Sequence, residues 1–149
     1  MPHDLYERDI LSWSEHQADL LRRVANGERV NDVDWPHVIE EISDVGSSEL
    51  RSVQSYLRQG MIHLLKLHLS PTDLARDHWL TEVEVFLDDA AQRFSPSMRQ
   101  RIDLDTIFAK ARARGSRHSA GQILPEVCPW ALDDLLAADV DALLAALPH

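Results

Sequence analysis

The chain has few of the residues that break or cross-link small proteins. Its 149 residues include 5 glycines, 7 prolines and a single cysteine, Cys128. So few glycines and prolines argue against an all-β chain, which needs many tight turns. A lone cysteine excludes an internal disulfide and is typical of a reducing compartment, so we expect a cytoplasmic protein.

Long apolar runs and positive charge are also scarce. No stretch approaches the roughly 20 apolar residues that a membrane-spanning helix needs. The acidic start MPHDLYERD is unlike a signal peptide. Lysine occurs only at Lys66 and Lys110, and the formal net charge is −10. An acidic surface disfavours nucleic acid and anionic membranes as partners.

Charge is distributed unevenly along the chain. Residues 1–60 carry 6 basic and 12 acidic side chains, residues 61–118 carry 9 and 8, and residues 119–149 carry none and 5. A basic face can therefore form only in the middle segment. We interpret its basic run as a solvated face that pairs with the acidic C-terminal segment, and a nucleic-acid contact is the alternative. The run consists of Arg93, Arg99, Arg101, Lys110, Arg112, Arg114 and Arg117.

Apolar side chains recur at spacings of three and four residues, which is the period of an amphipathic helix. The pattern predicts helices over about 4–25, 35–69, 73–94 and 96–112, followed by short helices near the C-terminus. Asp34 and Ser95 are plausible N-caps of the second and fourth helices. On the second helix the predicted apolar stripe consists of Ile39, Ile42, Gly46, Leu50, Val53, Leu57, Met61, Leu64 and His68.

The fold class that follows is all-α. Four principal helices with short connections predict an antiparallel up-and-down bundle. We expect a single domain over residues 1–149, with the segment 122–149 packing on the bundle.

Catalytic signatures are missing from the sequence. It has no P-loop, no G-x-S-x-G, no H-E-x-x-H and no clustered Cys and His. Asp34 and His37 have the spacing of a metal-ligand pair, but capping explains an Asp at a helix start. A zinc site built from His16, His63 and His118 is a weak alternative. We therefore predict no metal and no cofactor, and we lean against an enzyme.

Polar residues near the apolar faces are the candidates for a ligand site. Such groups either join a satisfied interior network or line a pocket. On one straight helix, Glu41 and His63 lie about 33 Å apart, so they mark two separate polar levels. Each level needs a partner from another helix. The candidates are Gln17, Glu41, Glu49, His63 and Lys66.

An ordered set of short motifs extends over nearly the whole chain. It resembles the bacterial family called domain of unknown function 29, and two positions, Leu67 and His78, depart from that family's pattern. The resemblance implies a small all-α bacterial protein whose biochemical role is unassigned, and it supplies no catalytic residue. The motifs are Trp13 with Gln17 and Arg22, IEEI (39–42) followed by VG (45–46), HLLK (63–66) with SP (70–71), Trp79, SPSMR (95–99) and CPW (128–130).

We therefore interpret the chain as a non-enzymatic interaction or regulatory module. Its partner is an unidentified protein or a second copy of the chain in a homodimer. One alternative is a ligand- or metal-binding bundle with a polar pocket. Another is a regulator associated with nucleic acid, which the charge disfavours.

Overall fold

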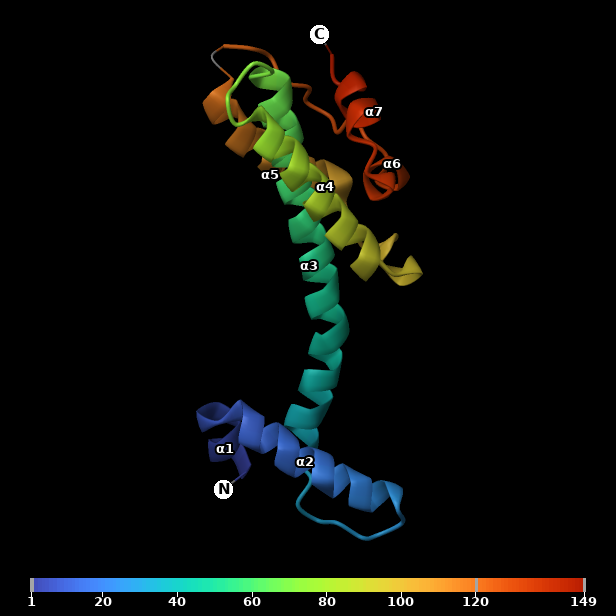
Figure 1. The fold of residues 1–149 in the computed structure, drawn as a ribbon. Coiled ribbons are helices and arrows are strands. Elements are labelled where there is room, and N and C mark those ends of the chain that lie inside the picture. The colour runs from blue at the N-terminus through green and yellow to red at the C-terminus, as the bar shows by residue number, and fades with distance from the viewer. Residues whose placement is uncertain (1, 120, 149) are drawn as a thin grey trace. The chain divides into compact units, whose positions relative to one another are not determined.

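The structure, a computed structural model, describes residues 2–119 and 121–148 (Figure 1). These residues contain helices and no strand, so the prediction of an all-α helical bundle is confirmed. The helices are α1 (Pro2–Arg8), α2 (Ile10–Ala25), α3 (Trp35–Leu69), α4 (Arg76–Arg93), η1 (Pro96–Met98), α5 (Leu104–Gly115), η2 (Ser116–His118), α6 (Leu132–Ala137) and α7 (Val140–Ala145).

The chain divides into two compact units, Met1–Ser47 and Ser48–His149, called unit 1 and unit 2 below. Helix α3 begins in unit 1 and ends in unit 2. The single domain expected over residues 1–149 stays a prediction.

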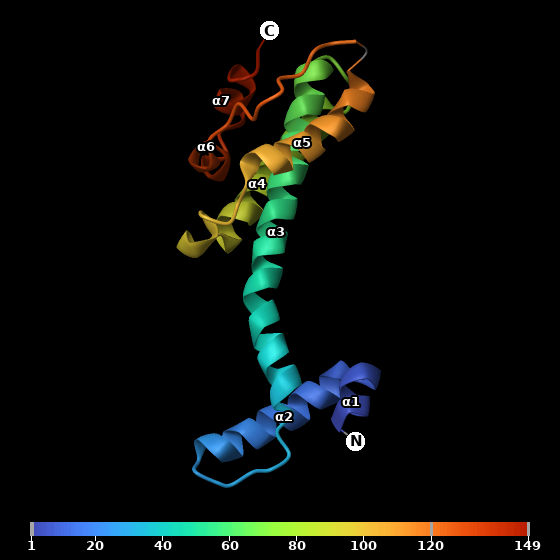
Figure 2. The same ribbon diagram turned by 180° about the vertical axis from the view of Figure 1, so that it is seen from behind.

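Unit 1 contains α1, α2 and the first turns of α3. The connection 26–34 runs back along α2 to the start of α3, as both ribbon views show (Figures 1 and 2). The buried apolar side chains of this unit are Trp13, Leu20, Val33 and Val38.

The helix predicted over 4–25 is divided at Asp9, which was not foreseen. Asp9 lies between α1 and α2, and its side chain accepts a hydrogen bond from the Ser12 backbone N–H at 3.1 Å. This bond satisfies one of the amide groups that a helix start leaves without a partner. The cap therefore gives α2 a start of its own within an otherwise continuous apolar pattern.

Unit 2 is built around the C-terminal half of α3. Helix α4 passes in front of α3 in Figure 1 and α5 passes in front of it in Figure 2, so the two flank α3 on opposite sides. Val53, Leu57, Met61 and Leu64 of α3 are fully buried in the core that results. The largest fully buried side chain of this core is Phe108 of α5, which meets the ring of Trp130 edge-on.

The C-terminal segment belongs to the same core. Leu135 of α6 and Leu143 of α7 are buried in it, and the contacts of both helices include α4. The indole N–H of Trp130 donates a hydrogen bond to the Leu143 backbone carbonyl at 2.8 Å. The irregular stretch before α6 is thereby fixed to α7.

Two further sequence-based expectations are wrong in detail. Ile39 and Ile42 were placed on a buried stripe, yet they are 60% and 68% exposed. Within unit 1, the core takes up the side of α3 that carries Val38 and leaves these two isoleucines outside. The fourth helix was expected to start near residue 96, but Asp103 caps it and α5 begins at Leu104.

A pair of glycines in α3 tests how tightly the helix is packed. A Cβ added at Gly60 would lie 2.6 Å from Leu87 Cδ2, whereas one at Gly46 would meet nothing within 4 Å. We expect Gly60→Ala to lower the free energy of unfolding by about 1–2 kcal/mol, because overpacking outweighs the gain in helix propensity. Gly46→Ala gains helix propensity without overpacking, so it should raise the free energy of unfolding by about 0.5–1 kcal/mol.

Urea unfolding followed by far-UV circular dichroism measures both changes. Equal stability of the two alanine variants would contradict the close approach of α4 to α3 at Gly60.

Candidate functional site

A buried carboxylate lies at the start of α3. Asp34 is 5% exposed, and its Oδ2 accepts a hydrogen bond from the Trp13 indole N–H at 3.1 Å. The same oxygen lies 2.6 Å from His37 Nδ1, which donates to it. The Asp34 backbone N–H donates to Gln17 Oε1 at 2.8 Å. Asp34 therefore joins α2, the connection 26–34 and α3.

Tyr6 of α1 extends this cluster to the next turn of α3. Its ring stacks on the His37 ring with 3.8 Å between centroids, and it meets the Trp13 ring edge-on at 4.9 Å. Its hydroxyl donates to Glu41 Oε1 at 2.5 Å. We call the set of Tyr6, Trp13, Gln17, Asp34, His37 and Glu41 the polar network.

The polar network shifts two pKa values. Burial by itself raises the pKa of Asp34, but the hydrogen bonds from His37 and Trp13 favour the carboxylate and hold the pKa below its ordinary value. The hydrogen bond to Glu41 raises the pKa of Tyr6 to about 12, and the nearby charge of Glu40 acts in the same direction. Asp34 is therefore ionised and Tyr6 protonated at neutral pH.

The side-chain amide nitrogen of Gln17 has no hydrogen-bond partner among the described residues. The Gln17 side chain is 2% exposed, so this nitrogen, Nε2, is buried. Leaving such a donor unpaired costs about 1–3 kcal/mol. The hydrogen bond between Gln17 Oε1 and the Asp34 backbone N–H holds the connection 26–34 against α2. The unpaired Nε2 of the same side chain lowers the free energy of unfolding.

The other side of α3 carries an exposed line of large apolar residues in unit 1. They follow one another at spacings of four, three and three residues, so neighbours along the line lie close on the helix surface. We call this line the apolar row. It consists of Trp35, Ile39, Ile42 and Val45, which are 50%, 60%, 68% and 67% exposed.

The charged residues around the apolar row are all acidic. No lysine or arginine occurs between Arg29 and Arg51. Glu40 and Asp44 are exposed on α3 itself, and Asp32 is exposed in the connection before it. A partner of the apolar row therefore meets negative charge at its edges.

The remaining candidates lie in unit 2. Glu49 forms an ion pair with Arg93 at 3.1 Å, and both side chains are nearly half exposed. The ammonium group of Lys66 lies 5.8 Å from the centre of the Trp79 ring. Neither contact differs from an ordinary surface interaction.

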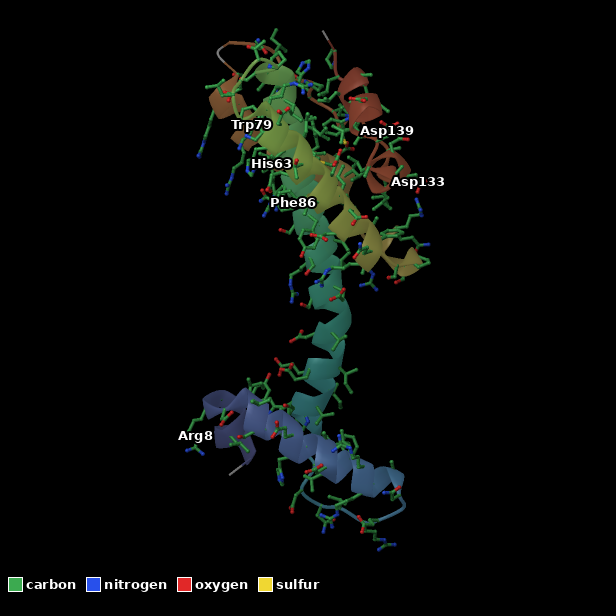
Figure 3. The ribbon with its side chains drawn as sticks, in the orientation of Figure 1. Arg8, His63, Trp79, Phe86, Asp133 and Asp139 are labelled. Atoms are coloured by element: carbon green, nitrogen blue, oxygen red, sulfur yellow. The ribbon has the colours of Figure 1, made fainter. Side chains whose placement is uncertain are left out.

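His63 is half-buried between α3 and α4. Its Nδ1 donates to the Gln59 backbone carbonyl at 2.8 Å, and its ring centre is 5.5 Å from that of Phe86 (Figure 3). Burial is the main cause that lowers the pKa of His63, and the nearby Lys66 adds to it. His63 is therefore neutral at neutral pH.

The structure thus joins two of the five candidates and leaves three elsewhere. Gln17 and Glu41 are linked through Asp34, His37 and Tyr6. Glu41 was expected to need a partner from another helix, and Tyr6 of α1 is that partner. Among the side chains that the structure describes, which do not include that of His118, no group of three or more His, Cys, Asp or Glu could hold a metal ion.

Sequence reasoning treated Asp34 as a cap and missed its contact with Trp13. The only signal was the Asp-x-x-His spacing of Asp34 and His37, which also fits capping alone. Tyr6 and Trp13 lie on two helices, α1 and α2, that the sequence pattern joins into one. Nothing in that pattern shows that their polar atoms reach Glu41 and Asp34.

Comparison with known proteins gives the chain a family. Residues 5–140 match the family described as domain of unknown function DUF29. The chain belongs to the DUF29 family. A crystal structure of an α-helical protein of unknown function from Rhodospirillum rubrum ATCC 11170 is also similar to it, with a TM-score of 0.75. The two sequences are 31% identical over 97% of this chain and 98% of that chain.

Other comparisons do not add an activity to this DUF29 chain. No curated protein matches it. Among its described helices, none has the length and apolarity needed to span a membrane.

The polar network predicts a pH-dependent contribution to stability. We expect Asp34→Asn to lower the free energy of unfolding by about 2 kcal/mol at neutral pH, because buried donors lose an ionised acceptor. A lowered pKa in the folded state means that this contribution is present above the ordinary pKa of about 3.9 and is lost as the pH falls below it. The difference between wild type and Asp34→Asn should therefore shrink between about pH 5 and pH 3.

Urea titrations followed by tryptophan fluorescence at several pH values measure this difference. The exposed Asp32→Asn is the control and should change stability by less than about 0.5 kcal/mol. A difference that stays constant down to about pH 3 would contradict an ionised Asp34.

Proposed function

We propose that this DUF29 protein is a non-enzymatic interaction module that binds a partner protein through the apolar row. One observation carries the proposal: four large apolar side chains, each at least half exposed, follow one another on α3. Scattered apolar residues are normal on a protein surface, but a contiguous line of them is typical of a binding site.

The spacing of the apolar row suits a helical partner. Side chains at intervals of three and four residues are the anchors by which an amphipathic helix packs against another apolar surface. Trp35 is a strong anchor because tryptophan buries a large area with few rotatable bonds. Ile39 and Ile42 continue the same contact surface.

The surrounding charge defines the chemistry of the partner. Glu40 and Asp44 are exposed near the apolar row, and no lysine or arginine lies within residues 30–50. A partner helix with lysine or arginine beside its apolar face would match this charge. A second copy of the chain would place like charges against each other, so we commit to a basic amphipathic helix from another protein.

The polar network supports this proposal over a ligand pocket. Its carboxylates and rings bond to one another, and this speaks for a structural role in which they hold the start of α3 against α1 and α2. The apolar row is then presented on a fixed helix. The lone Cys128 is in keeping with action in the cytoplasm.

A designed peptide provides a direct test. An amphipathic Leu/Lys helix of about 18 residues, or about five turns, is titrated against the protein, and the fluorescence of Trp35 reports binding. We expect Ile39→Ser/Ile42→Ser to weaken binding at least about tenfold, because two buried contacts are lost. The variant should stay folded, because both residues are exposed in the free protein.

The matched control is Ile123→Ser/Val127→Ser, which removes two exposed apolar side chains of unit 2. It should bind the peptide as wild type does. Equal weakening by both double variants, or equal binding of a Leu/Glu peptide, would refute the proposal. A concentration-dependent dimer that Ile39→Ser/Ile42→Ser abolishes would instead assign the apolar row to a second copy of the chain.

A further inference from the structure

A basic hollow lies along α3 and α5 in unit 2. It has two parts, of about 530 Å³ and about 290 Å³, which share Arg58 and Lys110 in their walls. We call the two parts together the basic furrow. Its basic side chains are Arg51, Arg58, Lys110, Arg114 and Arg117.

Regular helical spacing places these cations in one furrow. Arg51 and Arg58 are seven residues apart on α3, so they share a face and are about 10 Å apart along the axis. Lys110 and Arg114 are four residues apart on α5, and Arg117 follows in η2. Two rows of cations therefore face the same hollow.

The cations of the basic furrow are not neutralised by the protein. No ion pair with another described residue is formed by any of the five, whereas Arg93 pairs with Glu49 and Arg99 pairs with Asp133 of the acidic C-terminal segment. The basic run was expected to pair with that segment, and Arg99 does so. Lys110, Arg114 and Arg117 of the furrow belong to the run, but Arg51 and Arg58 lie outside it, so the sequence pattern did not show the furrow.

One carboxylate lines the basic furrow, and it already has a role. Asp103 accepts hydrogen bonds from the Thr106 hydroxyl at 2.8 Å and from the Thr106 backbone N–H at 3.3 Å. These bonds lower the pKa of Asp103 and cap α5. Five positive charges against one negative charge leave a cationic hollow on a chain whose net charge is −10.

We propose that the basic furrow binds a small oligophosphate, a ligand with several phosphate groups in a row. Arginine guanidinium groups bind phosphate oxygens through paired hydrogen bonds, and a ligand with several negative charges would relieve the repulsion between the two rows of cations. Gln54 and Ser55, which also line the hollow, add neutral hydrogen-bond donors. The volume of the larger part falls within the range of small-molecule sites.

Nucleic acid fits the basic furrow less well. Single-stranded nucleic acid is usually held by bases stacked on aromatic side chains, and no aromatic residue lines either part. The net charge of the chain repels a long polyanion, whereas a small ligand meets mainly the local field. The site is also independent of the apolar row, so either proposal can fail without the other.

Sodium tripolyphosphate is the probe for the test, titrated into the full-length protein by isothermal calorimetry at low ionic strength. We expect wild type to bind with a Kd below about 1 mM. Arg58→Gln/Lys110→Gln should weaken binding at least about tenfold, because each of these residues lines both parts of the furrow. Circular dichroism and urea unfolding establish that the variant is folded.

The matched control is Arg29→Gln/Arg101→Gln, which removes the same charge from two exposed arginines outside the furrow. Binding by the control within about twofold of wild type would support a built site rather than a general field. Absence of binding to wild type, or equal weakening by both double variants, would overturn the proposal. Tighter binding of a short oligonucleotide than of tripolyphosphate, lost in Arg58→Gln/Lys110→Gln, would also overturn it and assign the furrow to nucleic acid.

Discussion

Helix α3 has 35 residues, whereas none of the other described helices exceeds 18. At 1.5 Å per residue this is about 52 Å of helix against about 27 Å. No single helix of the described chain can cover α3 along its whole length, so its burial comes in segments. Val38 enters the core of unit 1, residues 53–69 supply much of the core of unit 2, and residues 39–45 keep apolar side chains outside. Both proposed binding surfaces use α3 residues that lie outside these cores.

Much of the fold was predictable because it depends on local patterns. The helical period and the position of Asp34 placed α3 with the ends that the structure has, and the predicted end of the first helix near residue 25 is the end of α2. The predictions were wrong where one sequence pattern is compatible with two different structures. Asp9 lies within an unbroken apolar period, and only the bond from the Ser12 amide shows that it caps a new helix. Ile39 and Ile42 share a face with buried residues, but periodicity defines a face and not what covers it.

The candidate site was predictable only in part, for the same reason. Gln17 was correctly recognised as a polar residue at a core position, because its place on the apolar face of α2 is a local property. Its bond to the Asp34 backbone, and that of Glu41 to Tyr6, span 17 and 35 residues of sequence. Such distant pairs depend on how the connection 26–34 returns to α3. The basic furrow depends on a similar pairing, since α3 and α5 each supply only two of its five cations.

The four tryptophans are divided evenly, with Trp13 and Trp35 in unit 1 and Trp79 and Trp130 in unit 2. In each unit one indole is 4% exposed and donates its N–H to a buried oxygen, that of Asp34 or of the Leu143 carbonyl. Each unit therefore contains its own optical reporter of folding. With Trp35 and Trp79 replaced, the remaining emission comes from one buried indole in each unit, so it changes in one step if the units melt together and in two steps if they melt apart. Coincident transitions would mean that the shared helix couples the units into one cooperative system, and separate transitions would mean that α3 can unwind at one end while it stays folded at the other.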